Sequence, residues 1–270
     1  MEFDAELLEL AVDRRGALEA LAAEPHHRRE LQEALSVSKT TCHRIVRAFD
    51  EWDLVRRTDD GYALSLYGRI VADRVEAFAD DVESATRMQS LLELLESSDA
   101  PFDDRAFVDG VSDWTVGHLE TFSIDEGLER VEDTELLRVL DWTPVPDLYH
   151  EKILRRLAEN EARVESIYPK AEIQDRLERF PDLHDELLEA GARPRYWVYE
   201  DVPPWGLSIY DDALAELRAY EPQSGAYLLE ATSDAPAAVE WALDVFDEYR
   251  DRARALPDVD GLPDWGDYTW

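Results

Sequence analysis

The spacing of apolar and polar residues near the start of the chain predicts two helices followed by a β-hairpin. Over residues 27–35, and again from Lys39 onward, apolar side chains recur every three or four residues, which is the period of an amphipathic helix. Two short runs follow, residues 54–58 and 62–66, separated by the turn sequence Asp59-Asp60-Gly61. This order predicts a winged helix-turn-helix over residues 28–66, with the hairpin as the wing.

The second of these helices is expected to have two different faces. Ser36-Val37-Ser38 interrupts the first helix, and Ser38 is placed to cap the second. The stripe predicted to be buried consists of Cys42, Ile45, Val46 and Phe49, and the opposite stripe consists of Lys39, Thr40, His43, Arg44 and Arg47. Residues 36–47 contain three Lys or Arg residues and no Asp or Glu, although acidic residues outnumber basic ones in the rest of the chain.

A basic helix followed by a hairpin with two arginines is typical of a DNA-binding head. The helix would enter the major groove, and arginines of the wing would reach phosphates beside it. The candidate DNA-binding residues are Ser38, Lys39, Thr40, Thr41, His43, Arg44, Arg47, Arg56 and Arg57. The alternative is a small helical core with a hairpin that serves protein contacts.

Two single residues of this region have their own interpretation. Asp53 stands where many winged heads have a glycine, and aspartate tolerates the left-handed backbone conformation better than most residues. Cys42 is the only cysteine, so an internal disulfide and a cysteine-based zinc site are excluded. Its place on the apolar stripe favours a core residue over a redox switch.

Residues 67–97 are predicted to form one long helix that links the head to a second domain. The apolar positions that recur along it, with Gln89 as one polar break, are Val71, Val75, Phe78, Val82, Ala85, Leu92 and Leu95. Such a stripe indicates a short coiled-coil seam between two protomers, and a dimer would present two recognition helices to one DNA site. The alternative is that the stripe packs on its own chain.

The remaining sequence alternates between short apolar runs and amphipathic segments, which predicts an α/β domain. Strands are expected at residues 136–140, 163–168, 195–199, 206–210, 214–220 and 226–231, and helices at 148–157, 173–180, 183–190 and 235–255. The expected domains are 1–68 for the winged head, 69–98 for the linker and dimerisation helix, 99–256 for the α/β domain, and 257–270 for an acidic aromatic tail.

The charge of the chain lies mainly in its second part. Residues 1–74 carry 11 Lys or Arg and 15 Asp or Glu, a net charge of -4, which leaves -31 of the total -35 for the other 196 residues. The acids are dispersed rather than gathered in a tail, and only Lys39, Lys152 and Lys170 are lysines. This style resembles that of salt-in haloarchaeal proteins; an acidic tail for a basic partner is the alternative.

Nothing in the sequence indicates a membrane span, a signal peptide or a metal site. No run approaches the roughly 18 apolar residues of a spanning helix, so a cytoplasmic location is expected. The histidines have no metal-ligand spacing, and we expect neither a metal nor a cofactor.

Several segments of the second domain resemble those of a known family. They are Glu165-Ser-Ile-Tyr-Pro169, Arg195-Tyr-Trp-Val198, the run from Val202 to Tyr210, and the closing helix from Val239 to Tyr249. Together with the head and the long helix, they look like archaeal winged-helix regulators of the methanogenesis-regulator (filament-regulator) type, similar in layout to TrmB-like regulators. The resemblance implies a transcription regulator whose second domain, related to phospholipase-D-like folds, serves sensing and dimerisation.

The sequence does not support catalysis in this domain. Phospholipase-D chemistry needs the spacing His-x-Lys-x4-Asp, and His150 and Lys152 begin it, but Leu157 stands where the Asp is due. A small polar or anionic effector could instead bind at the carboxyl ends of the strands. The candidate ligand-binding residues are Trp142, Thr143, Tyr168, Lys170 and Trp205. The alternative is that these aromatic side chains fill the core.

Two functions from different classes are therefore open. The first is a homodimeric, sequence-specific transcription regulator that binds double-stranded DNA, with or without an effector. The second is a protein-interaction adaptor, or a chromatin-associated protein with weak or no specific DNA binding.

Overall fold

The computed structural model describes residues 5–97, 107, 110–118, 128–142, 147–180, 189, 193–221 and 226–256. The chain forms two compact units, Met1–Glu83 and Ser84–Trp270. The division falls within the predicted linker of residues 69–98. The predicted tail of residues 257–270, and the predicted helix of residues 183–190 apart from Glu189, lie outside the described residues.

The first unit, called the head below, contains the predicted helix-turn-helix and wing. Its elements are α1 (Ala5–Asp13), α2 (Arg15–Ala23), α3 (Arg28–Ala34), α4 (Lys39–Glu51), β1 (Val55–Thr58), β2 (Gly61–Leu64) and the greater part of α5 (Leu66–Arg87). Leu18, Leu31, Phe49, Leu54 and Leu64, from α2, α3, α4 and the wing, are each at most 1% exposed and form the centre of its core. The elements expected between residues 28 and 66 are thus confirmed, whereas α1 and α2 were not predicted.

The long helix of residues 67–97 is two helices, α5 and α6 (Gln89–Ser97), separated by Met88. The predicted seam is divided between two cores. Val71 and Val75 pack in the head, while Leu92 and Leu95 pack in the core of the α/β domain. The alternative interpretation, that the stripe packs on its own chain, therefore holds for these four residues.

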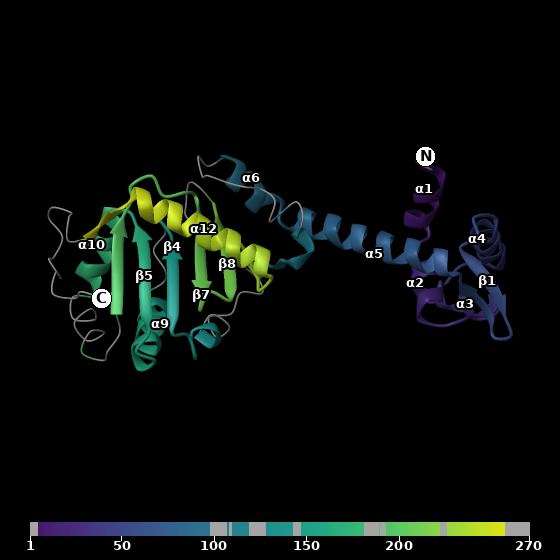
Figure 1. Ribbon diagram of the computed structural model, residues 1–270, viewed down its shortest axis with the longest axis horizontal. Coiled ribbons are helices and arrows are strands. Elements are labelled where there is room, and N and C mark those ends of the chain that lie inside the picture. Colours follow the sequence, from purple (N-terminus) through teal and green to yellow (C-terminus); the bar gives the residue numbers. More distant parts are fainter. Residues whose placement is uncertain are drawn as a thin grey trace. The chain divides into compact units, whose positions relative to one another are not determined.

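The second unit is built on an eight-stranded sheet in the order β10-β6-β5-β4-β7-β8-β9-β3 (Figure 1). The strands are β3 (Thr115–His118), β4 (Leu136–Leu140), β5 (Arg163–Tyr168), β6 (Arg193–Val198), β7 (Trp205–Tyr210), β8 (Leu214–Tyr220), β9 (Tyr227–Ser233) and β10 (Arg254–Ala255). β4, β5 and β6 are parallel, and the other pairings are antiparallel. All six predicted strands are present, and the α/β class is confirmed.

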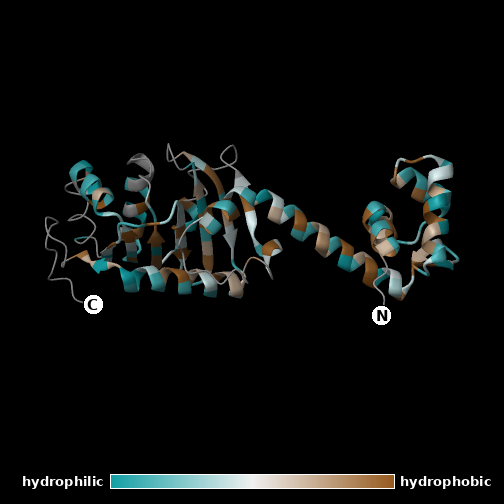
Figure 2. Cartoon of the chain, turned by 90° about the horizontal axis from the view of Figure 1, so that it is seen from above, coloured by the Kyte–Doolittle hydropathy of each residue, from teal (hydrophilic) through white to brown (hydrophobic). Residues whose placement is uncertain are grey.

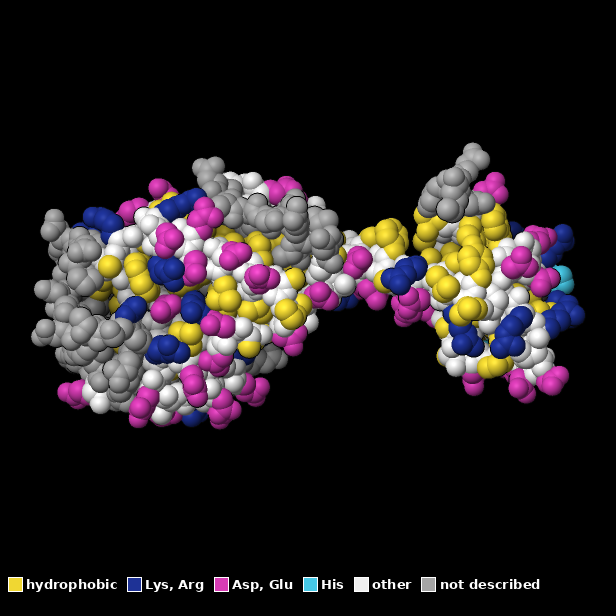
Figure 3. All heavy atoms as spheres, in the orientation of Figure 1, with side chains coloured by type: hydrophobic (Ala, Val, Ile, Leu, Met, Phe, Trp, Pro, Cys, Tyr) yellow, Lys and Arg dark blue, Asp and Glu magenta, His cyan; other side chains and the backbone are white. Residues whose placement is uncertain are grey.

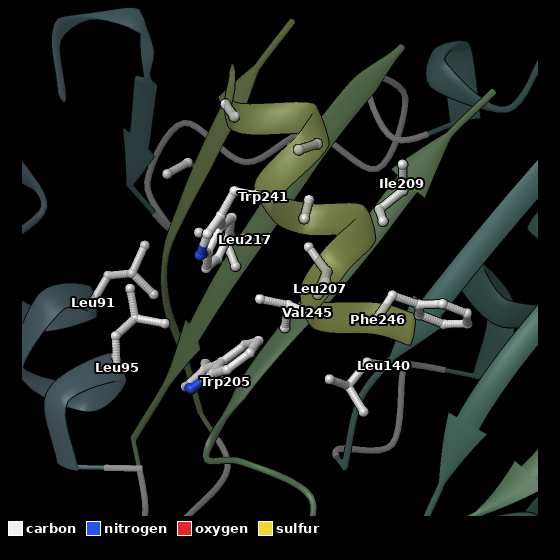
Figure 4. Close-up of a cluster of buried hydrophobic side chains, with 14 of the residues drawn as sticks. Leu91, Leu95, Leu140, Trp205, Leu207, Ile209, Leu217, Trp241, Val245 and Phe246 are labelled. Carbon is white, nitrogen blue, oxygen red and sulfur yellow. The ribbon is translucent and has the colours of Figure 1, made fainter. Parts of the chain in front are cut away.

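Helices cover both faces of this sheet. On one face, α12 (Pro236–Arg252) and α6 pack against apolar residues of β4, β7 and β8, as Figure 4 shows for Trp241, Val245 and Phe246 above Leu207 and Leu217. On the other face, α9 (Asp147–Glu159) contributes Leu157 and α10 (Lys170–Arg179) contributes Ile173. A short 3-10 turn, η1 (Val111–Asp113), precedes β3.

Apolar residues are concentrated in the strands, as expected for a sheet covered on two sides. Figure 2 shows brown strands beside helices along which brown and teal bands alternate. Among the described residues, no helix has the length and apolar content needed to cross a membrane.

Candidate nucleic-acid interface

The start of α4 is fixed by a tight turn and a side-chain cap. Ser36 has a positive φ of 52°, which lets the chain reverse direction between α3 and α4. The Ser38 hydroxyl oxygen accepts a hydrogen bond of 3.1 Å from the backbone N–H of Thr41, and the two side-chain oxygens lie 2.9 Å apart. The predicted serine cap is confirmed, and two candidate DNA-binding residues, Ser38 and Thr41, take part in it.

The buried stripe of α4 determines which side of the helix faces outward. Cys42, Ile45, Val46 and Phe49 are at most 5% exposed, as the apolar pattern predicts. The Cys42 thiol donates a hydrogen bond of 3.3 Å to the carbonyl oxygen of Arg28, which ties α4 to the first residue of α3. Burial raises the pKa of the Cys42 thiol, so the unreactive protonated form is favoured and the core interpretation is supported.

The opposite stripe of α4 is exposed along its whole length: Lys39, Thr40, His43, Arg44 and Arg47. Arg47 Nε lies 2.9 Å from Glu51 Oε1, one turn further along the helix. Lys39 and Arg44, in contrast, form no ion pair with any described residue. An exposed ion pair contributes at most about 1 kcal/mol, so Arg47 can exchange Glu51 for a phosphate at low cost, and Lys39 and Arg44 have no carboxylate to give up.

The wing is held close to the head by a backbone bridge. His26 and Tyr62 exchange two backbone hydrogen bonds, 2.9 Å from the His26 N–H and 2.8 Å from the Tyr62 N–H. The neighbouring Gly61 has a φ of +117°, and a Cβ atom there would lie 2.4 Å from the His26 carbonyl oxygen. Only glycine therefore allows the chain before α3 to approach the hairpin this closely.

This bridge assembles a basic cluster that the sequence did not predict. The guanidinium carbons of Arg28 and Arg57 lie 5.3 Å and 5.7 Å from the centre of the Tyr62 ring, within cation–π range. Arg57 is directly opposite Tyr62 in the hairpin, whereas Arg28 comes from α3. Neither arginine forms an ion pair with a described residue, and both are exposed, as is Arg56. We call Arg28, Arg57 and Tyr62 the wing cluster.

Charge alone does not mark this interface. Figure 3 shows dark-blue basic and magenta acidic side chains close together on the head. Some arginines are neutralised by neighbours, as in the pairs Arg15–Glu19, Arg29–Glu33 and Arg74–Asp73. Lys39 and Arg44 of the α4 stripe, Arg56, and the two arginines of the wing cluster instead lack a carboxylate partner in the described part of the head, and they come from α3, α4 and the wing.

The candidate ligand-binding residues of the α/β domain do not form a single pocket wall. Trp205 is fully buried under α12, its ring centre 6.3 Å from that of Tyr249. Trp142 packs edge-to-face on Tyr220 at 6.1 Å, on the other face of the sheet. Tyr168 is 5% exposed and stacks under the Arg176 guanidinium at 4.2 Å. The core interpretation is thus supported for Trp205. Lys170 is the first residue of α10 and half-buried, and Thr143 lies outside the described residues.

A buried ionic network lies on the sheet face opposite α12. Arg218 Nη2 donates to Asp141 Oδ2 at 3.0 Å, and Arg218 also pairs with Glu216. Arg130 joins Glu216, at 2.6 Å, to Glu230. The hydroxyls of Tyr210 and Tyr220 donate to Glu216 and Asp141 at 3.0 Å and 2.9 Å. The sequence analysis predicted none of these contacts.

The helix-turn-helix, its wing and the uncompensated basic residues define the class of this protein: it is a DNA-binding regulator. Residues 3–87 match the family model of the HVO_A0261 N-terminal domain, and residues 123–252 match that of the middle domain of the methanogenesis regulatory protein FilR1. The chain is therefore similar, over both parts, to archaeal regulators of the methanogenesis-regulator type, as the sequence resemblance implied.

Several solved structures are similar to this chain at low identity. TrmBL2, an archaeal chromatin protein, is 15% identical with a TM-score of 0.41, covering 94% of this chain and 100% of that chain. Nuc from Salmonella typhimurium, a phospholipase D family member, is 12% identical with a TM-score of 0.40 over 53% of this chain and 96% of its own. NucT from Helicobacter pylori is 11% identical with a TM-score of 0.39 over 53% and 98%. No curated protein matches the chain in sequence.

Proposed function

We propose that this protein is a homodimeric transcription regulator that binds specific DNA sequences in the cytoplasm. The observation that carries the proposal is the exposed stripe of α4, capped by Ser38, on which Lys39 and Arg44 are without carboxylate partners among the described residues of a strongly acidic chain. The stripe would read base edges in the major groove, and Arg56 and the wing cluster would hold the flanking phosphates.

The high acid content of the chain indicates that this binding takes place in concentrated salt. At an ionic strength of 1 M the Debye length is only about 3 Å, so attraction between distant charges is lost. Binding then depends on close contacts, and arginines without a competing carboxylate are the side chains that make such contacts at the lowest cost.

DNA binding can be tested by fluorescence anisotropy with labelled duplexes from the region upstream of the protein's own gene, in KCl up to molar concentration. Arg44→Ala should weaken binding about tenfold, since a good base contact is worth about 1–3 kcal/mol. Arg15→Ala is a matched control, because Arg15 is on α2 and pairs with Glu19 at 2.7 Å. Equal binding by wild type and Arg44→Ala would show that α4 does not read DNA.

The same assay distinguishes specific from non-specific binding. A regulator should bind one upstream fragment far more tightly than a shuffled duplex of the same length, whereas a chromatin-associated protein would bind both alike. A protein that binds neither duplex would instead be an adaptor, and the proposed function would fail.

We propose further that the α/β domain is non-catalytic and binds a small polar effector near Trp142. The Trp142 indole N–H is buried without a hydrogen-bond partner among the described residues, and an acceptor atom of a ligand placed beside it would satisfy it. Thermal-shift measurements with small anions and polar metabolites, on wild type and Trp142→Phe, would test this. A compound that stabilises both proteins equally does not bind at Trp142.

A further inference from the structure

Glu51 is an acidic residue at the end of the exposed stripe of α4. Positions 40, 44, 47 and 51 follow one another at steps of four, three and four residues, so they lie along one side of the helix. The Glu51 carboxylate oxygen Oε1 lies 2.9 Å from Arg47 Nε, and the two side chains are 59% and 72% exposed. The helix face proposed to bind DNA therefore has a carboxylate that already occupies one of its arginines.

The stability of α4 does not account for Glu51. The helix ends at this residue, and a negative charge in the last turn lies at the negative end of the helix dipole, where it is unfavourable. An arginine followed by a glutamate four residues later is also the weaker of the two possible orders of an ion pair on a helix. The main effect of the pair is therefore on what Arg47 is able to contact.

Glu51 and DNA compete for the same guanidinium group. An arginine that reads guanine donates its N–H groups to two acceptor atoms of the base, and the Arg47 N–H at Nε already donates to Glu51. Lys39 and Arg44, in contrast, form no ion pair with any described residue. Binding through Arg47 therefore requires that its ion pair with Glu51 be broken first.

The two competing contacts of Arg47 respond differently to salt. The exposed pair with Glu51 joins two opposite charges, and dissolved ions screen it, since the Debye length is only about 3 Å at 1 M. A contact with a guanine joins a charge to neutral acceptor atoms within the major groove, so it depends less on the ionic strength. Rising salt therefore shifts Arg47 from Glu51 towards DNA.

We infer that Glu51 is an internal competitor of DNA for Arg47. In dilute salt the pair Arg47–Glu51 weakens DNA binding, and in concentrated salt it releases Arg47 to the DNA. The inference rests on the proposed function and adds a salt-dependent regulation of the same interface, located in one ion pair of α4.

A double-mutant cycle with Arg47→Ala and Glu51→Gln tests the competition. Fluorescence anisotropy with the duplex that the wild type binds most tightly gives the affinities in dilute and in molar KCl. In dilute salt, Arg47→Ala should weaken binding about two- to fivefold more in the Glu51→Gln background than in the wild-type background, the range expected for an exposed ion pair. In molar KCl this difference should disappear. Circular dichroism confirms that each variant is folded.

Asp50→Asn is the matched control for the change of charge. Asp50 is adjacent to Glu51 and exposed, and it forms no ion pair with any described residue. Its substitution removes one negative charge near the DNA but leaves the pair Arg47–Glu51 in place. Arg47→Ala should therefore weaken binding by the same factor in the Asp50→Asn background as in the wild-type background.

The result of the cycle also separates this inference from the proposed function. Equal effects of Arg47→Ala in the wild-type and Glu51→Gln backgrounds would show that Glu51 does not compete with DNA. A smaller effect in the Glu51→Gln background would show that Glu51 positions Arg47 for DNA, and a difference that persists in molar KCl would show that salt does not release Arg47. Each of these results overturns the inference alone. If the wild type binds no duplex, the proposed function fails and the inference fails with it.

Discussion

Gly68, in the first turn of α5, lies directly against the backbone of Leu54: a Cβ atom at position 68 would stand 1.9 Å from the Leu54 carbonyl oxygen. The backbone N–H of Gly68 donates a hydrogen bond of 2.9 Å to the Ser65 hydroxyl oxygen. That hydroxyl in turn donates a hydrogen bond of 2.7 Å to the Asp53 carbonyl oxygen. The start of α5 is thus joined to the residues that lead into the wing.

Gly68→Ala should therefore destabilise the head, because backbone rather than a movable side chain occupies the space. Forced overpacking typically costs about 1–3 kcal/mol. Gly16→Ala is the matched control: Gly16 lies in α2, and the nearest atom to its added Cβ would be 3.9 Å away, in the Leu35 side chain. That control should be stabilising by about 0.5–1 kcal/mol, the usual gain from replacing glycine within a helix. Denaturant unfolding of both variants checks the two signs.

The wing cluster should contribute to DNA affinity independently of base sequence. Arg28→Ala is expected to weaken binding to specific and shuffled duplexes by similar factors, and to reduce the slope of log K against log salt by about 1. Arg29→Ala provides the comparison, because the adjacent Arg29 is also exposed but pairs with Glu33 at 3.0 Å. Identical salt slopes for both variants and wild type would remove Arg28 from the interface.

The buried network should be far more sensitive to substitution than the surface ion pairs. Arg218→Ala leaves the buried carboxylates of Asp141 and Glu216 without their shared cation, which typically costs about 3–5 kcal/mol. Arg155→Ala, which removes an exposed pair with Glu151 on α9, should cost about 0.5 kcal/mol or less. Calorimetric unfolding of the two variants would show whether the loss of stability from Arg218→Ala is at least about six times that from Arg155→Ala.

Acid should weaken the α/β domain through Glu216. Burial alone would raise the pKa of this carboxyl, but Arg218 and Arg130 outweigh burial and hold the pKa below its usual value. A carboxyl with a lowered pKa in the folded state stabilises the fold above its unfolded pKa, about 4.3 for glutamate, and this stability is lost as the pH falls further. Glu216→Gln should lower the Tm at neutral pH and make it less dependent on acid. An unchanged pH dependence of Tm would contradict this role.

The sequence was sufficient where the physical signal is local. The serine cap of α4, its four buried apolar residues and the Asp-Gly hairpin depend on residues a few positions apart, and all were predicted. The left-handed conformation that aspartate tolerates is also present, since Asp53 has a φ of 55°. For the same reason six of the eight described strands of the α/β domain could be predicted from their own composition and turns, whereas the short edge strands β3 and β10 were not predicted.

The sequence was insufficient where contacts join distant segments. Arg28 reaches Tyr62 only because His26 bridges to the hairpin, and the pair Arg218–Asp141 joins residues 77 positions apart. No Pro or Gly stands at the interruption between α5 and α6 at Met88, so the sequence contains no helix-breaking residue that would predict it. Backbone hydrogen bonds from the Met88 N–H to the Ser84 carbonyl oxygen and from the Leu92 N–H to the Met88 carbonyl oxygen continue across the interruption. The apolar stripe of residues 67–97 packs in two separate cores, Val71 and Val75 in the head and Leu92 and Leu95 in the α/β domain. Periodicity alone could not show where the stripe passes from one core to the other.

The network around Arg218 also determines how the α/β domain would respond to concentrated salt. Ions in solution weaken attractions between charges that they can surround, and the exposed pairs on α9, α10 and α12 are open to them. Asp141 and Glu216 are 1% and 3% exposed, so dissolved ions cannot come between them and their arginine. As the salt concentration rises, the attraction within the surface ion pairs weakens, whereas the attraction within the buried pairs is retained. The electrostatic contribution to the stability of this domain then comes mainly from its buried ion pairs.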